Sequence, residues 1–351
     1  MYWRDRALER EQHWYDLTTS ELDEKVKRYY ESSLEKIERD ILALYARYAD
    51  ENGLSAVEAR RLIRGKEFRQ WRMTLEEYVK AARNDSAILK ELNTLAMRSR
   101  INRLEKLMAE TLMELDTLCE KTNDFLTSFL SRAYYDNYYK SLYDLHRRAG
   151  LYDTPVKADD AQVKKVIRTA WVGSNYSSRI WSNGYKLALT IEELMKAAVH
   201  RGLSTKKLSR ELSRRMSAGY NNAERLIRTE LNFVQNKAAF DSMQSAGFEQ
   251  YRFTATLDHR TCPSCGSLDG RIFPLSEQMP GDNAPPIHPR CRCTVIPVID
   301  ESTGRISERR VKVPAEMNYA EWRKTYIDKS KTLEQWQSKR LNVRETNYWF
   351  I

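Results

Sequence analysis

Apolar residues along most of the chain recur every three or four positions, which is the spacing of one face of an α-helix. Ile37 and Ile41 carry this spacing early in the chain, and a longer stripe runs from Leu104 to Leu115. The stripe lies in a stretch, residues 87–148, that contains no proline. A single helix of that length would be unusual, so the pattern predicts an elongated helical region that allows one break.

Helical spacing resumes after a turn-rich stretch at residues 150–160 and continues to about Ser245. Within it, one helix is expected to end near Met216. Asn221 is followed three positions later by Glu224, which resembles the capping box that opens a helix. A separate helix is therefore expected to begin there.

The pattern changes after Gly247, where apolar and polar residues alternate in the manner of half-buried strands. Three short strands are expected, in residues 250–257, 271–273 and 293–299. The predicted fold class is mainly α with a small α+β module: a long helical N-terminal region, then helices and a short antiparallel sheet clasped by Cys and His. In the tail, Tyr319, Trp322 and Tyr326 have helical spacing, so a short helix is expected to dock there.

Composition narrows the class of protein. The chain has 351 residues, of which 41% are hydrophobic and 31% charged, and its net charge is +10. No run of about 18 apolar residues occurs, so no membrane contact is expected. The positive balance favours a polyanionic partner such as nucleic acid, although the same charges could simply solvate helices.

Basic residues concentrate around one short helix that is expected within the second helical block. They are Lys206, Lys207, Arg210, Arg214 and Arg215. Contact between this cluster and double-stranded DNA would be independent of base sequence and sensitive to salt. The alternative is an ordinary solvated helix face.

Four of the five cysteines fall between residues 262 and 293. In a chain made in a reducing cytoplasm, clustered cysteines indicate a metal site before a disulfide. Cys262, Cys265 and Cys291 are the strongest candidate ligands of a structural zinc ion, and His288 and Cys293 compete for the fourth place. The alternatives are free thiols, or a disulfide formed once the protein has left the cell.

An enzymatic role has little support in the motifs. A His-Glu-x-x-His segment does not occur. Zinc deaminases place His-x-Glu before their Cys pair, whereas here the order is reversed and Arg290 stands where the glutamate would be. The chain is therefore expected not to be an enzyme.

Several segments together resemble the phage Mu F-like head-morphogenesis domain of phage minor head proteins. They are Arg228-Thr-Glu-Leu-Asn232, Ala255–Cys265, Leu268-Asp-Gly270 and Pro285–Cys293. Tyr134–Lys140, Ser177–Asn183 and Met317–Trp322 are also similar to parts of such proteins. Mu-like members keep the Cys-Arg-Cys end but replace the first Cys pair, so a metal is not implied for the whole family.

The resemblance implies a virion component inside the phage head, synthesised in the host cytoplasm. Expected partners are the portal protein, the major capsid or scaffolding protein, and packaged DNA. Alternatives are a packaging factor that binds DNA outside the virion, and a zinc-dependent enzyme or toxin-like effector. The expected domains are a helical region at 1–150, the Mu F-like domain at 158–300 with its Cys/His module at about 250–300, and a tail at 301–351.

Some residues of the resembling segments are expected to have structural roles. Arg228 and Glu230 would hold the loops of the Cys/His module by hydrogen bonds. Asp258, Asp269 and Gly270 are assigned to the framework of that module.

Overall fold

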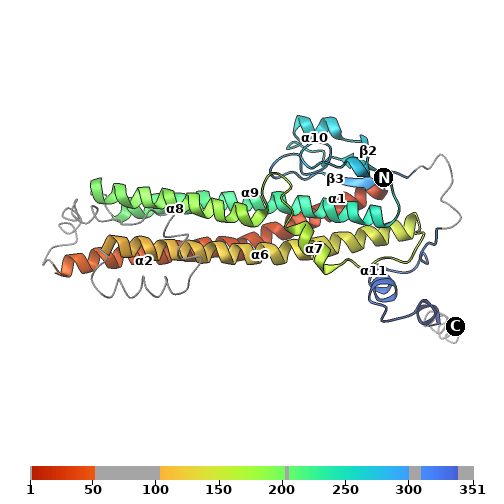
Figure 1. The fold of residues 1–351 in the computed structure, drawn as a ribbon, viewed down its shortest axis with the longest axis horizontal. Helices are drawn as coiled ribbons and strands as arrows, with labels where there is room; N and C mark the ends of the chain where they lie inside the picture. The colour runs from red at the N-terminus through yellow and green to blue at the C-terminus, as the bar shows by residue number, and fades with distance from the viewer. Residues whose placement is uncertain (1, 52–102, 202–204, 300–309, 339–351) are drawn as a thin grey trace, which may run out of the picture. The chain divides into compact units, whose positions relative to one another are not determined.

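The computed structural model describes residues 2–51, 103–201, 205–299 and 310–338. The described chain is mainly helical and includes a three-stranded antiparallel sheet, which confirms the predicted fold class (Figure 1). Residues 52–102, inside the expected helical region, and part of the expected tail lie outside the described residues.

Contacts between residues divide the chain into two compact units, and each combines separated stretches. The first, here called the bundle unit, comprises Thr19–Leu126 and Tyr176–Leu226. The second, here called the module unit, comprises Met1–Thr18, Thr127–Asn175 and Ile227–Ile351. The domain limits expected from the sequence, at 1–150, 158–300 and 301–351, stay a prediction.

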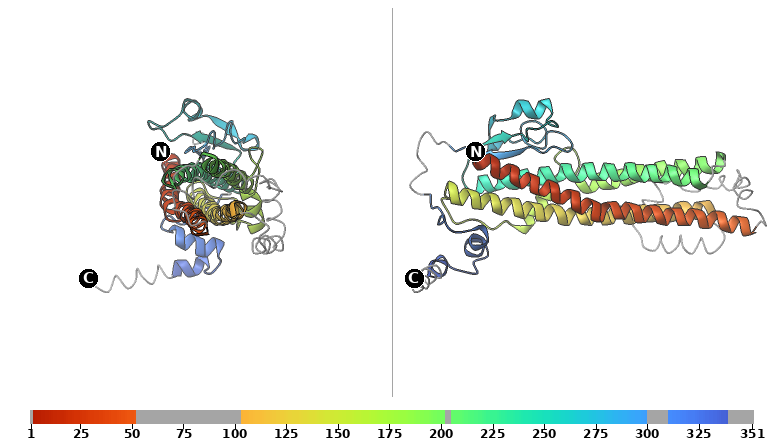
Figure 2. Two further views of the ribbon diagram at one scale, coloured as in Figure 1. Left: turned by 90° about the vertical axis from the view of Figure 1, so that its left-hand side faces the viewer. Right: turned by 180° about the vertical axis from the view of Figure 1, so that it is seen from behind.

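The bundle unit is built from long amphipathic helices (Figures 1 and 2). These are α2 (Lys27–Glu51), the first part of α6 (Arg103–Arg148), α8 (Tyr176–Arg201) and the first part of α9 (Thr205–Ser245), with a short π-helical turn at Leu22–Val26 before α2. Each helix contributes to one apolar core, for example through Ile37, Leu112, Ile191 and Leu212. The helical spacing seen in the sequence therefore reflects burial of one face of each helix.

One expectation about helix ends is corrected, because α9 is one helix where two were expected. From Arg103 onward α6 runs without a break, and the earlier part of that expected region lies outside the described residues. Asn221 is an exposed residue inside α9 rather than a cap. The glycine before it, Gly219, serves packing: a Cβ there would lie 2.9 Å from Leu187 Cδ2 and 3.1 Å from Tyr30 Cε1. Glycine is needed for this close approach, not to end the helix.

In the module unit, the tyrosines of α6 face inward. Tyr134 and Tyr138 stack with ring centroids 6.1 Å apart, and the Tyr134 hydroxyl donates to Asp241 Oδ2 on α9 at 2.6 Å. The Tyr143 hydroxyl donates to the Met317 carbonyl at 2.7 Å. These rings are therefore packing residues with a satisfied polar end.

Helix α1 (Tyr2–Glu21) is tied to α6 by a buried carboxylate. Asp144 has 1% of its surface exposed and accepts from the Tyr2 hydroxyl at 2.9 Å and from Arg10 Nη1 at 2.5 Å. Arg6 Nε lies 3.4 Å from the same carboxylate. Because a buried charge is costly without partners, this set fixes the position of α1 along α6 within the unit.

The sheet lies against the C-terminal part of α9 (Figure 2). Its strands are β1 (Gln250–Thr254), β2 (Ile272–Pro274) and β3 (Thr294–Pro297), in the order β2-β1-β3. Tyr251 and Phe253 on the inner face are fully buried, and the Tyr251 ring lies 4.8 Å from that of Phe240 on α9. β1 and β3 fall within the residues expected to be extended, and β2 lies one residue further along the chain than expected.

The tail returns to α6 within the module unit. Asn318 and Glu321 form a capping box at the start of α11 (Tyr319–Trp322), and a π-helical turn, Arg323–Ile327, continues it. The Trp322 side chain is fully buried, and its indole Nε1 donates to His146 Nδ1 at 3.0 Å. His146 must therefore carry no proton on Nδ1, because this nitrogen accepts the hydrogen bond.

This contact predicts a loss of stability in mild acid. Burial lowers the pKa of His146 to about 4, against 6.5 in an unfolded chain. The part of the free energy of unfolding that depends on neutral His146 is fully present above pH 6.5. It is lost as the pH falls towards 4, by about 3 kcal/mol in total. We expect His146→Gln to flatten this part of the pH profile of urea unfolding. The exposed His13→Gln serves as the control, and equal profiles for the two variants would refute the assignment.

Candidate metal centre

The first Cys pair sits on a tight turn leading into the short helix α10 (Pro263–Leu268). Cys262 is the N-cap residue, and its Sγ accepts the backbone N–H of Cys265 at 3.3 Å. Pro263 at the first helical position has the backbone angle that this turn requires. The turn brings the side chains of Cys262 and Cys265 together.

The second set of ligand candidates lies on the loop that leads into β3. The Cys291 N–H donates to the His288 carbonyl at 3.1 Å, which closes a turn. Beyond it, the Cys293 carbonyl accepts from Asn232 Nδ2 at 3.0 Å and from Asn236 Nδ2 at 3.1 Å. Both asparagines are buried on α9, so this helix fixes the Cys-Arg-Cys end.

All five candidate ligands meet in one cluster. Two groups of three have their ligand atoms within 4.8 Å of one another: Cys262, Cys265 and His288, and Cys265, Cys291 and Cys293. Cys265 belongs to both groups. The sequence could therefore predict which residues form the cluster, but not that Cys265 is the residue shared by both groups.

Distances within the cluster suit a tetrahedral ion. Cys265 Sγ lies 3.9 Å from Cys291 Sγ and 3.3 Å from His288 Nε2. Around an ion with bonds of about 2.3 Å to sulfur and about 2.0 Å to nitrogen, the corresponding separations are about 3.8 and 3.5 Å. Cys265 therefore fits as the shared ligand, whereas Cys291 and His288 belong to different groups of ligand atoms, so one ion bound by both would have to draw their side chains together.

The imidazole of His288 is oriented as a ligand. Its Nδ1 lies 2.9 Å from the Pro289 carbonyl, and because a carbonyl only accepts, Nδ1 must carry the proton. The lone pair of a neutral ring is then on Nε2, the atom that faces Cys265. Metal-bound histidines are commonly held by such a backbone acceptor.

Electrostatics also favour a cation at this place. Contact with Cys291 and then with Cys293 raises the pKa of Cys265, since several thiolates cannot ionise side by side. The hydrogen bond from Cys265 lowers the pKa of Cys291, so one sulfur of the pair holds the charge. A bound cation would relieve this repulsion and allow all the ligating thiols to ionise.

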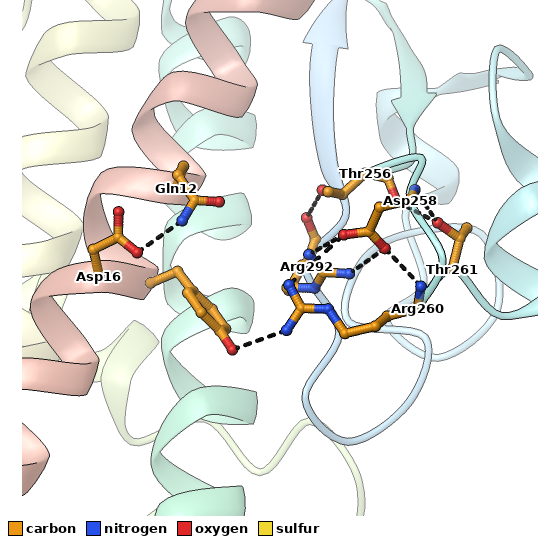
Figure 3. Close-up of polar contacts among 8 residues, drawn as sticks. Gln12, Asp16, Thr256, Asp258, Arg260, Thr261 and Arg292 are labelled. Carbon is orange, nitrogen blue, oxygen red and sulfur yellow. Dashed lines mark hydrogen bonds and ion pairs between the residues drawn. The ribbon is translucent and has the colours of Figure 1, made fainter.

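Ion pairs and hydrogen bonds brace the loop before the first Cys pair (Figure 3). Asp258 accepts from both terminal nitrogens of Arg292, at 2.7 and 2.8 Å, and from the Arg260 N–H at 2.8 Å. The hydrogen bonds from Arg292 hold the pKa of Asp258 well below its usual range. Thr256 Oγ1 donates to the Arg292 carbonyl at 2.5 Å. The two halves of the cluster are thus linked outside the sulfur atoms.

Asp269 and Gly270 occupy the turn between α10 and β2. Asp269 Oδ1 accepts from the Ala255 N–H at 2.8 Å, and Arg4 Nη1 on α1 lies 3.2 Å from the same oxygen. Gly270 has φ +79°, which favours glycine, and its N–H donates to the Phe253 carbonyl at 2.9 Å. Both residues lie in the framework of the module.

Arg228 and Glu230 lie on α9 near the module. The Arg228 guanidinium is 4.4 Å from the centre of the Tyr15 ring, and Glu230 Oε2 accepts from Trp171 Nε1 at 2.9 Å. Whether either residue holds the module loops stays a prediction. Thr229 does so directly, because its Oγ1 accepts the Arg290 N–H at 3.0 Å.

Sequence reasoning missed three buried residues that support the cluster: Asn236, Thr229 and Glu11. Glu11 on α1 accepts from Asn232 Nδ2 at 3.1 Å, and burial raises its pKa to about 8. A glutamate on an otherwise polar helix gave no signal of this role. The four-residue spacing of Asn232 and Asn236, which puts both on one face, was the signal available for the asparagines.

The basic cluster lies at the start of α9, in the bundle unit. Lys206, Lys207, Arg210 and Arg214 are exposed. Arg215 is half-buried, and its guanidinium bonds to Glu211 Oε2 at 2.9 Å and to the Thr190 carbonyl at 3.0 Å. Arg214 also pairs with Glu211, at 2.8 Å. The structure therefore separates Arg215, which braces the bundle, from the exposed cations.

These features define a helical protein with a small sheet module that carries a cluster of Cys and His side chains. Residues 189–296 match the family model described as Phage Mu protein F like protein. This segment is therefore similar to the phage Mu F-like family, and the similarity supports a relation to phage head-morphogenesis and minor head proteins. The match ends at Ile296, on β3, just past the Cys/His cluster. Comparisons with curated proteins and with solved structures give no match.

The match points to a phage head-related structural protein and, with it, to the virion. Among the described helices, none combines the length and apolar character required to cross a bilayer.

The anchoring of Cys293 predicts that Asn232 matters for stability. Asn232→Ala removes one donor from the Cys293 carbonyl and leaves the buried Glu11 without its amide, so we expect a loss of about 1 to 3 kcal/mol. Urea unfolding measures this. The control is Asn222→Ala on the same helix, where the side chain is exposed and the change should stay within about 0.5 kcal/mol. Equal losses of unfolding free energy in the two variants would show that the hydrogen bonds of Asn232 contribute nothing to stability.

Proposed function

We propose that this chain is a minor head protein of a bacteriophage: a structural and assembly component inside the head, without catalytic activity. It would contact the portal, the capsid or scaffolding protein and packaged DNA, and act in head morphogenesis and in DNA packaging or ejection. The observation that carries the proposal is the phage Mu F-like match over residues 189–296. Supporting it, the matched segment contains the whole Cys/His cluster.

The experiment is mass spectrometry of purified procapsids and DNA-filled particles. We expect the chain in both, in few copies, and protected from external protease until the heads are opened. Coat protein exposed on the particle surface is the control for protease action. Presence in procapsids but absence from filled heads would favour a packaging factor outside the virion, and absence from both would overturn the proposal.

The Cys/His cluster would hold one structural zinc ion through Cys262, Cys265, His288 and Cys291. The Cys265–Cys291 distance matches a tetrahedral edge, and Nε2 of His288 is the free nitrogen of its ring. Cys293 would stay beside the site, with its carbonyl held by α9. Four protein ligands leave no open position for a substrate, which favours a structural over a catalytic ion.

This assignment predicts about one zinc per purified chain, measured by native mass spectrometry. We expect Cys265→Ser to lose the metal, because this residue belongs to both groups of ligand atoms. Cys119→Ser, at a buried cysteine outside the cluster, should retain it. Retention of zinc by Cys265→Ser, or its absence from the unchanged chain, would contradict the assignment.

Direct contact with DNA would use the exposed cations of α9. Lys206, Arg210 and Arg214 are four residues apart in turn, so they lie on one face of the helix. Such a row can follow phosphates without reading bases. The supporting observation is that all three side chains are exposed, although Arg214 shares its charge with Glu211.

Replacing these three residues by glutamine should weaken binding to duplex DNA and change its salt dependence. The slope of log K against log salt should become shallower by about 2 to 3, since each phosphate contact contributes about 0.9. Fluorescence anisotropy at several salt concentrations measures it. The control removes three exposed cations from the region of helix α7 (Asp160–Ile167), namely Lys157, Lys164 and Arg168. An equal change in both variants would mean that only net charge matters.

A further inference from the structure

We propose that the cluster is also an oxidation site, at which hydrogen peroxide replaces the metal by a disulfide between Cys265 and Cys291. This inference rests on the proposed zinc clasp for its starting state. The product would join the same two segments by a covalent bond: the turn of α10 and the loop before β3. The module would then be held by the metal ion in reducing surroundings and by the disulfide in oxidising ones.

The position of Cys265 carries the proposal. It is the residue shared by both groups of ligand atoms, so its sulfur lies within 4.8 Å of Cys262, Cys291 and Cys293 alike. Its distance to Cys291 Sγ is 3.9 Å. A disulfide needs about 2.05 Å between sulfurs, so each sulfur must move by about 1 Å, which side-chain rotation can supply.

Exposure sets the order of events. Cys265, Cys291 and Cys293 are buried, whereas Cys262 is only half-buried. Cys262 is therefore the sulfur that a peroxide molecule meets first. It touches the shared residue directly, because the Cys265 N–H donates to its Sγ. Oxidation can pass inward from Cys262 to Cys265 and from there to Cys291.

The chemistry balances in three steps. The Cys262 thiolate attacks one peroxide oxygen, the O–O bond breaks, and the hydroxide that leaves takes up a proton, which gives a sulfenic acid and water. The Cys265 thiolate attacks the sulfenic sulfur, a sulfur–sulfur bond forms, and a second hydroxide leaves as water. The Cys291 thiolate then attacks the Cys265 sulfur and releases Cys262 as a thiolate. Two thiols have lost two electrons, and peroxide is reduced to two water molecules.

The final thiol–disulfide exchange keeps the two segments of the module joined. A bond between Cys262 and Cys265 would lie within one turn and connect nothing else. A bond between Cys265 and Cys291 closes a loop between residues 26 positions apart, which restricts the unfolded chain far more. A particle that moves from the reducing cytoplasm to the oxidising exterior meets the conditions for this change.

The test uses the full-length, metal-loaded chain, titrated with hydrogen peroxide. We expect release of zinc to a chromogenic chelator and the loss of two thiols per chain. Non-reducing peptide mapping after alkylation should show Cys265 linked to Cys291. Cys119→Ser, outside the cluster, and Cys293→Ala, beside it, should give the same linked peptide.

Three other results of the peptide mapping would overturn the inference. They are a Cys262–Cys265 disulfide that persists, a Cys265–Cys293 disulfide, and sulfinic acids without a disulfide. Zinc content measured before the titration separates this inference from the zinc proposal. A Cys265–Cys291 bond in a chain that is purified without zinc would leave the disulfide standing and refute the zinc clasp. A metal-loaded chain that forms no such bond would do the reverse.

Discussion

A sheet of three short strands cannot bury enough apolar surface to stand alone, and this constraint explains the arrangement of the module unit. Tyr251 and Phe253 find their cover on α9 and in the cluster of cysteines. The loops between strands are long relative to the strands, so their ordering costs conformational entropy that this small core offsets poorly. Crosslinks of another kind are needed, and two hydrogen bonds from α9 to the Cys293 carbonyl provide the first of them.

Helix α1 extends the same support by polar contacts. Within the module unit it bonds to α6 through Asp144, to the module through Asp269, and to α9 through Asn232. Few of these groups face water, so each would be costly to leave unpaired. This favours one position of α1 over neighbouring ones, because a shift by a single residue would leave several buried groups without partners.

The sequence predicted what depends on local spacing. Helical stripes, three strands and the five members of the Cys/His cluster were all visible, because each is set by residues close together in the chain. The division of α9 was predicted wrongly, because a capping box also occurs by chance and Gly219 is explained only by its contacts with Leu187 and Tyr30. Glu11 and Thr229 were missed since their partners lie 221 and 61 positions away. Such pairings follow from packing, which local pattern does not encode.

Two proposed activities draw on α9 through different physical effects. The exposed cations between Lys206 and Arg214 would act by charge, which salt screens. The buried asparagines Asn232 and Asn236 act by hydrogen bonds that water does not reach, so salt should leave these bonds unchanged. Coordination of a metal adds a third dependence, on thiolate and imidazole protonation. Because salt, substitution and chelation each address one of these effects, DNA contact and closure of the module can be varied independently in the same chain, and neither has to be inferred from the other.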